Sequence, residues 1–149
     1  MESARLIFLT QFAATAMMTG IIWFVQIVHY PLFLRIPPEG FVAYEQLHTV
    51  RTGSVVAPLM LLELGTALLP LLLRLPGATH PLYLAAVGVL LLVWASTFLV
   101  QVPLHRLLST RPDTAAMLLL VTTNWIRTLL WTLRLGLLGT FLLRHPDYL

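Results

Sequence analysis

The sequence predicts an all-α protein, an integral membrane four-helix transmembrane bundle that forms one domain over residues 1–149. Two observations support this fold class, the composition and the distribution of apolar residues. The 149 residues are 58% hydrophobic and only 10% charged, whereas soluble domains carry about 25% charged residues. The apolar residues are concentrated in four runs, each of which reaches the roughly 20 residues that a helix needs to cross hydrocarbon. Cysteine is absent, which excludes disulfides and thiolate metal sites.

The four expected spans are residues 6–33, 55–73, 82–102 and 115–143. The first run is too long for the apolar core of a signal peptide, so it is expected to be a retained transmembrane helix. Gly77 and Pro81 mark the second connection. Thr110 and Asp113 match a capping box that would start the last helix, with Thr110 as the N-cap residue.

The first connection is the longest, and it is expected to contain a short interfacial helix, between helices one and two, that runs into the second span. Phe41, Tyr44 and His48 fall on one helical face after Pro37 and Pro38. Four crossings place the end of helix one, the start of two, the end of three and the start of four on one membrane side, called the site side below. Four arginines on this side against three on the other do not fix the orientation.

One face of the fourth helix carries polar residues that predict a buried site. Asn124, Arg127, Trp131 and Arg134 recur at spacings of three and four. An arginine near the bilayer centre costs roughly 2.5–3.5 kcal/mol on insertion scales, so this face should point into protein. Glu63 has a similar predicted depth in helix two, so a buried Glu63–Arg127 ion pair is expected. Arg134 then has no acidic partner, and it either extends to the far interface or binds an anionic or carbonyl-bearing ligand.

Polar and aromatic residues on helices one and three are expected to face this stripe and to form a cavity with it. They are Thr19, Trp23, Gln26 and Tyr30 on helix one, and Trp94, Thr97, Gln101 and His105 on helix three. Trp23, Trp94 and Trp131 would then stack on a planar ligand. The alternatives are hydrogen bonding between helices for the polar residues and packing or an interfacial position for the tryptophans.

Three histidines are expected to meet on the site side, because His29 ends helix one, His48 precedes helix two and His105 ends helix three. Neutral imidazole is the commonest metal ligand. Four roles remain open: a three-histidine metal centre, a haem held by two of the histidines, proton transfer, and a structural role. No pair of these histidines has the i, i+4 spacing that makes a helical metal motif strong. His80 and His145 are expected to be loop residues on the far side.

Two stretches resemble a family of small bacterial four-helix membrane proteins. The first is WFVQIVHYPLF at residues 23–33, and the second is QVPLHRLL at residues 101–108 followed by NWIRT at residues 124–128. The second half is also distantly similar to the anthrone-oxygenase-like membrane family, in which a Pro-x-Asn motif ends helix three and a Trp and Arg-Thr pattern follows in helix four. His105 stands at the asparagine position. The resemblance implies oxidation of a phenolic or quinone-like compound.

The preferred function is a membrane-embedded, oxygenase-like oxidoreductase for a lipophilic aromatic or quinone-like substrate, with a metal ion or haem bound by histidines as the candidate cofactor. Its candidate catalytic residues are His29, His48, His105, Glu63 and Arg127, and the same three histidines are the candidate metal ligands. Its candidate substrate-binding residues are Trp23, Gln26, Tyr30, Trp94, Gln101, Asn124, Trp131 and Arg134. The arginines would hold a phenolate or carbonyl oxygen.

Two other functions stay open. One is a non-enzymatic binding or transport module for a small anion or haem, and the other is a membrane subunit whose polar faces pack against partner helices. The expected location is the bacterial inner (cytoplasmic) membrane, and the expected partners are the lipid bilayer and a lipophilic small molecule. A homo-oligomer is also open. Nucleic acid is excluded as a partner because no basic patch is interleaved with exposed aromatic residues.

Overall fold

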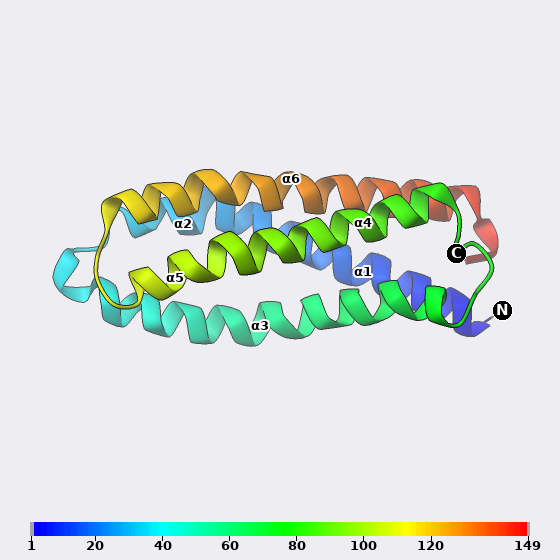
Figure 1. The fold of residues 1–149 in the computed structure, drawn as a ribbon, viewed down its shortest axis with the longest axis horizontal. Helices are drawn as coiled ribbons and strands as arrows, with labels where there is room; N and C mark the ends of the chain where they lie inside the picture. The colour runs from blue at the N-terminus through cyan, green and yellow to red at the C-terminus, as the bar shows by residue number, and fades with distance from the viewer. Residues whose placement is uncertain (1, 149) are drawn as a thin grey trace.

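The computed structural model describes residues 2–148, which form a bundle of four long helices whose axes run roughly parallel or antiparallel to one another (Figure 1). The elements in chain order are α1 (Glu2–Phe24), η1 (Val25–His29), α2 (Tyr30–Phe33), α3 (Pro38–Leu72), α4 (Pro81–Ser96), η2 (Thr97–Gln101), α5 (Val102–Leu108), α6 (Thr114–Arg144) and η3 (Pro146–Tyr148). The first three elements form one continuous span, and so do α4, η2 and α5. All four spans are long and apolar enough to cross a membrane. The predicted all-α transmembrane bundle is therefore confirmed.

The second span is much longer than its apolar run. Helix α3 begins at Pro38, not near residue 55, and continues without interruption to Leu72. The expected interfacial helix is therefore the first part of α3 and runs into the second span, as predicted, without a break. Pro38 occupies the first helical turn, where its missing N–H leaves no hydrogen bond unmade. Only residues 34–37 remain as the first connection.

The start of α6 also differs from its prediction. Asp113 is the N-cap residue, and its carboxylate accepts a hydrogen bond of 3.0 Å from the backbone N–H of Ala116. Thr110 instead donates its hydroxyl hydrogen to the carbonyl of Leu107, 2.7 Å away, in the turn that ends α5. The third connection is so short that Thr110 still belongs to the preceding helix end.

Two five-residue π-helical turns, η1 and η2, interrupt the first and third spans. Each lies just before a proline, Pro31 or Pro103. In an α-helix the proline ring would clash with the carbonyl four residues earlier, which belongs to Ile27 or Leu99, inside the widened turn. The π-turns thus accommodate the prolines. They also rotate the residues that follow, which include Tyr30 and His105.

The core consists of two hydrophobic clusters, one in each half of the bundle. The site-side cluster includes Met18, Met60 and Trp131, and the far-side cluster includes Phe8 and Leu138. The large exposed apolar side chains are mostly leucines, as expected for a surface that faces lipid. The bundle therefore buries its polar residues between these clusters and around the site-side one.

The far-side connection requires a glycine at position 77. Gly77 has a φ of +82°, and a Cβ there would lie 3.1 Å from the ring of Phe141 and 3.2 Å from that of Tyr148. Tyr148 closes this end by donating a hydrogen bond of 2.6 Å to the carbonyl of Pro76. His80 is the N-cap residue of α4 and accepts a hydrogen bond from the N–H of Leu82. His80 therefore stabilises the start of α4.

Candidate functional site

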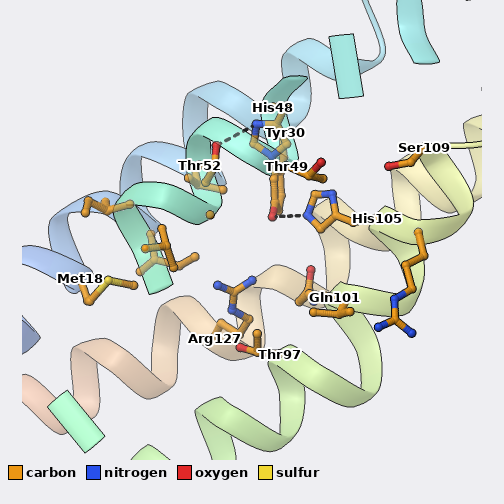
Figure 2. A pocket seen from close by; sticks show the side chains of 17 residues that line it. Met18, Tyr30, His48, Thr49, Thr52, Thr97, Gln101, His105, Ser109 and Arg127 are labelled. Carbon is orange, nitrogen blue, oxygen red and sulfur yellow. Dashed lines mark hydrogen bonds between the residues drawn. The ribbon is translucent and has the colours of Figure 1, made fainter. Parts of the chain in front are cut away.

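A cavity of about 430 Å³ lies in the site-side half, between residues from all four spans (Figure 2). This volume is within the usual range for small-molecule sites. Its apolar wall is formed by Met18, Ile21, Ile22, Val25, Val56 and Val102, and its polar wall includes Tyr30, His48, Thr52, Gln101, His105 and Arg127. Five of the predicted site residues thus line one cavity: Tyr30, His48, Gln101, His105 and Arg127.

Gln26 and Asn124 lie beside the cavity and join two helices. The Nδ2 of Asn124 donates to the Oε1 of Gln26 over 2.9 Å. The Nε2 of Gln26 donates to the carbonyl of Val121 over 3.1 Å. Within the described part of the chain, neither residue is among those that line the cavity. They form the contact that the alternative describes, a hydrogen-bonded link between η1 and α6, and their role in substrate binding stays a prediction.

The three predicted stacking tryptophans do not line this cavity of the described chain. Trp23 is 38% exposed, donates to the hydroxyl of Thr132 over 3.0 Å and packs edge-on against Trp125. Trp94 packs against both core clusters. Trp131 is fully buried. The predicted helix faces correctly place Trp94 and Trp131 inside the bundle. The apolar wall of the cavity, however, is formed by aliphatic side chains and not by tryptophan rings.

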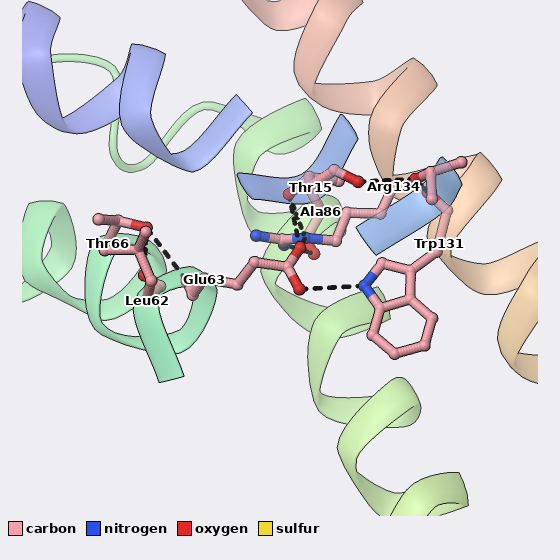
Figure 3. Close-up of polar contacts among 8 residues, drawn as sticks. Thr15, Leu62, Glu63, Thr66, Ala86, Trp131 and Arg134 are labelled. Atoms are coloured by element: carbon pink, nitrogen blue, oxygen red, sulfur yellow. Dashed lines mark hydrogen bonds and ion pairs between the residues drawn. The ribbon is translucent and has the colours of Figure 1, made fainter. Parts of the chain in front are cut away.

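The predicted Glu63–Arg127 ion pair is wrong, because Glu63 pairs with Arg134 (Figure 3). The Nε of Arg134 lies 3.4 Å from the Oε1 of Glu63, and both side chains are fully buried. Helix α3 starts at Pro38, so Glu63 lies about 37 Å along it, whereas Arg134 lies about 30 Å and Arg127 about 20 Å along α6. Because α3 starts earlier than predicted, the carboxylate of Glu63 lies closer to the depth of Arg134 than to that of Arg127.

Polar partners complete the Glu63–Arg134 pair. Thr15 donates to the Oε1 of Glu63 over 2.6 Å, and the Nε1 of Trp131 donates to its Oε2 over 3.0 Å. Arg134 also donates from its Nη1 to the carbonyl of Ala86. These contacts satisfy both carboxylate oxygens of Glu63 and two of the three guanidinium nitrogens of Arg134, while its Nη2 is buried without a hydrogen-bond partner among residues 2–148. Additional hydrogen bonds of this kind are what make a buried ion pair tolerable. We interpret this cluster as a structural centre outside the cavity.

Arg127 lines the cavity and has no carboxylate partner among residues 2–148. It is only 6% exposed, and its guanidinium carbon lies 5.2 Å from the centroid of the Trp131 ring. Its guanidinium also interacts with the hydroxyl of Tyr30. Figure 2 shows the guanidinium pointing from α6 into the space below Tyr30. A cation–π contact partly stabilises this charge but does not neutralise it.

The three predicted histidines come together at the site-side end of the cavity. The Nε2 of His29 lies 2.7 Å from the Nδ1 of His48, and the rings of His48 and His105 have centroids 5.4 Å apart. The hydroxyl of Thr52 lies 3.0 Å from the same Nδ1 of His48. The hydroxyl of Tyr30 lies 2.9 Å from the Nε2 of His105. The topology that the even number of spans predicted is the reason for this convergence.

A glutamate that the sequence analysis missed completes this cluster. The Oε1 of Glu45 lies 2.5 Å from the Nδ1 of His105, and the Oε2 is buried without a hydrogen-bond partner within residues 2–148. One ligand atom from each of Glu45, His48 and His105 lies within 4.8 Å of the other two. His29 is not a member of this group and contacts His48 from outside it, while the three-histidine metal centre stays a prediction.

The spacing of Glu45 and His48 was the available signal. Residues three apart lie on the same face of a helix, and a Glu-x-x-His pair is the arrangement by which helical bundles bind iron or manganese. The expected interfacial helix already placed Glu45 and His48 three residues apart, but its face was defined by Phe41, Tyr44 and His48, and Glu45 was not considered as a ligand.

No protein-family model matches the sequence, and neither the curated proteins nor the solved structures contain a significant match to it.

Proposed function

We propose that this protein is a membrane-embedded, oxygenase-like oxidoreductase in which Glu45, His48 and His105 hold a redox-active transition metal beside the substrate cavity. The observation that carries the proposal is the convergence of these three ligands, two of which, His48 and His105, line a largely apolar cavity. Two histidines and one carboxylate form the ligand set of non-haem iron oxygenases, which leaves coordination positions for dioxygen and substrate. Dioxygen is the oxidant in this reaction class.

Two of the three residues have a free ligand atom for a metal, whereas His105 would bind it in place of its contact with Glu45 or with Tyr30. Glu45 is fully buried, and its unpartnered Oε2 is a lone-pair donor that a cation would satisfy. His48 uses its Nδ1 for His29 and Thr52, which leaves its Nε2 for a metal. Outer hydrogen bonds of this kind fix the ring orientation of metal-bound histidines. His29 is therefore a positioning residue in this proposal.

The substrate is a lipophilic aromatic or quinone-like compound. The cavity lies within the membrane-spanning bundle, so we expect a substrate that is dissolved in the lipid. The resemblance of residues 101–108 and 124–128 to the anthrone-oxygenase-like family supports the same substrate class. We extend the proposal to membership of the small bacterial four-helix membrane proteins and to a location in the bacterial inner membrane, on that resemblance alone.

Metal analysis of the purified protein and its variants tests the proposal. The protein is prepared in detergent, loaded anaerobically with Fe(II) and desalted, and its metal content is measured. The native protein should retain about one ion per chain, and Glu45→Gln and His48→Gln should lose most of it. Two matched controls, Glu39→Gln in the exposed first turn of α3 and His145→Gln at the far end, should keep it.

Oxygen uptake separates an enzyme from a binding protein. The iron-loaded native protein should consume dioxygen when a lipophilic hydroquinone is added, and Glu45→Gln should not. Failure of the native protein to retain iron, manganese or copper would refute the proposed redox-active metal centre. Retained metal without turnover of any phenolic or quinone-like compound would favour the alternative function, a binding module.

A further inference from the structure

We infer that the cavity binds a lipophilic anion that also carries a hydroxyl group, with Arg127 at the anionic oxygen and Gln101 at the hydroxyl. This deepens the proposed function, because it names the substrate class of the same cavity. The binding itself is independent of the metal and can be measured without it.

The charge of Arg127 is the first part of the argument. A guanidinium stays protonated in proteins, and an unpaired charge in a transmembrane span is costly and marks a functional site by default. Arg127 is only 6% exposed, and its Nε has no hydrogen-bond partner within residues 2–148. Arg134, on the same face, already has Glu63. Arg127 is thus the arginine of this face whose countercharge has to come from a ligand.

The orientation of the Gln101 amide is the second part. The hydroxyl of Thr123 donates its hydrogen to the carbonyl of Leu119, 2.6 Å away. Its oxygen is therefore free only to accept, so the group of Gln101 that lies 3.1 Å from it is the NH₂. This network fixes the amide assignment. The Oε1 of Gln101 is left buried, with no donor in the part of the chain that the structure describes.

The cavity therefore presents an unpaired cation and an unpaired acceptor together. Leaving both unsatisfied is unfavourable, and a ligand that brings one anionic oxygen and one O–H group would pair them. Figure 2 shows Gln101 and Arg127 projecting into the cavity on the side opposite His48 and Thr52. The remaining wall is aliphatic, with Met18 and Ile22 among its residues. These features select a phenolate or carboxylate on an apolar ring system and disfavour cations, plain hydrocarbons and small inorganic anions.

A set of three related probes tests this inference in the detergent-purified, metal-free protein. The first is a naphthoic acid with a hydroxyl group on its second ring, the second is the same acid without the hydroxyl, and the third is the methyl ester of the first. Binding is measured by quenching of the naphthalene fluorescence. The native protein should bind the hydroxy acid about tenfold more tightly than the ester, which corresponds to the loss of one charge-assisted contact.

The variants assign the contacts. Arg127→Met should lose the preference for the acid over the ester while still binding the ester, which also shows that the variant is folded. Gln101→Leu should lose the preference for the hydroxy acid over the plain acid. Arg144→Met, an exposed arginine at the other end of α6, should behave like the native protein. A common affinity of the native protein for all three probes, or an unchanged acid preference in Arg127→Met, would overturn the inference.

The proposed metal-dependent function and the inferred ligand preference can be refuted independently of each other. Preference for the hydroxy acid in a protein that retains no metal would refute the proposed function and leave this inference standing. Retained metal together with equal binding of acid and ester would do the reverse.

Discussion

Glu63 and Arg134 form a buried ion pair between the two hydrophobic clusters of the bundle, with 3.4 Å between the Oε1 of one and the Nε of the other. On α3, Glu63 falls between Met60 of the site-side cluster and Ala67 of the far-side cluster. On α6, Arg134 falls between Trp131 and Leu138 in the same way. The pair therefore forms a polar layer that links α1, α3 and α6 between two apolar ones.

Removing one member of this pair should destabilise the protein strongly. Glu63→Gln leaves the guanidinium of Arg134 without a countercharge, and the expected loss is about 3–5 kcal/mol of the free energy of unfolding. Reversible unfolding in mixed detergent measures it. The double variant Glu63→Gln/Arg134→Gln should be less destabilised than the sum of the single changes, because neither charge is then left alone. Strict additivity of the two changes would contradict a direct interaction between them.

Metal binding should stabilise the native fold. A ligand that binds only the folded state adds stability by mass action, about 2.7 kcal/mol at a hundredfold excess over its Kd. We expect Fe(II) to raise the melting temperature of the chelator-treated protein, and a chelator to reverse the shift. In Glu45→Gln the shift should disappear. The Glu39→Gln control should still show it, and an equal shift in both variants would place the metal elsewhere.

Gly77→Ala should weaken the far end of the bundle without affecting the site. An alanine at a φ of +82° costs about 1–3 kcal/mol in backbone strain, and its Cβ would press on Phe141 and Tyr148. The loss is measured by thermal unfolding in detergent. Gly88→Ala is the matched control, because a Cβ there meets nothing within 4 Å and alanine favours a helix. Metal retention should be unchanged in both variants.

Cysteine labelling should confirm which helix ends share a membrane side. The protein has no native cysteine, so single cysteines can be introduced without background. A membrane-impermeant maleimide applied to oriented vesicles should label Glu39→Cys and Arg111→Cys from one face and Asp147→Cys from the other. Labelling of Glu39→Cys and Arg111→Cys from opposite faces would refute the four-span topology.

The fold could be predicted from the sequence because hydrophobicity alone determines it. Lipid requires every backbone group to bond within its own segment, so four long apolar runs leave few alternatives to four helices. The starts of α3 and α6 could not be predicted in the same way. Polar stretches such as residues 38–54 continue a helix above the hydrocarbon, where hydropathy no longer distinguishes helix from loop.

The site was predictable only where topology determined it. His29, His48 and His105 meet because helix ends on one side must meet. The partner of Glu63 was missed because its depth was counted from a start about 17 residues too late, which is about 25 Å of helix. Glu45 was missed for another reason, because it lies within the expected interfacial helix but no acidic partner was sought for His48 or His105. The helix boundary therefore explains the error about Glu63 and not the one about Glu45.

The π-turns η1 and η2 have a consequence for comparing this chain with its relatives. A π-turn is equivalent to one extra residue in an α-helix, and one residue corresponds to a rotation of about 100°. A homologue that lacked that residue would keep the same hydropathy profile and the same four spans. Everything beyond the turn would face another direction, however, and the counterpart of His105 would leave the cluster. Whether a homologue keeps the cluster therefore depends on the number of residues before Pro31 and Pro103 as much as on which residues they are.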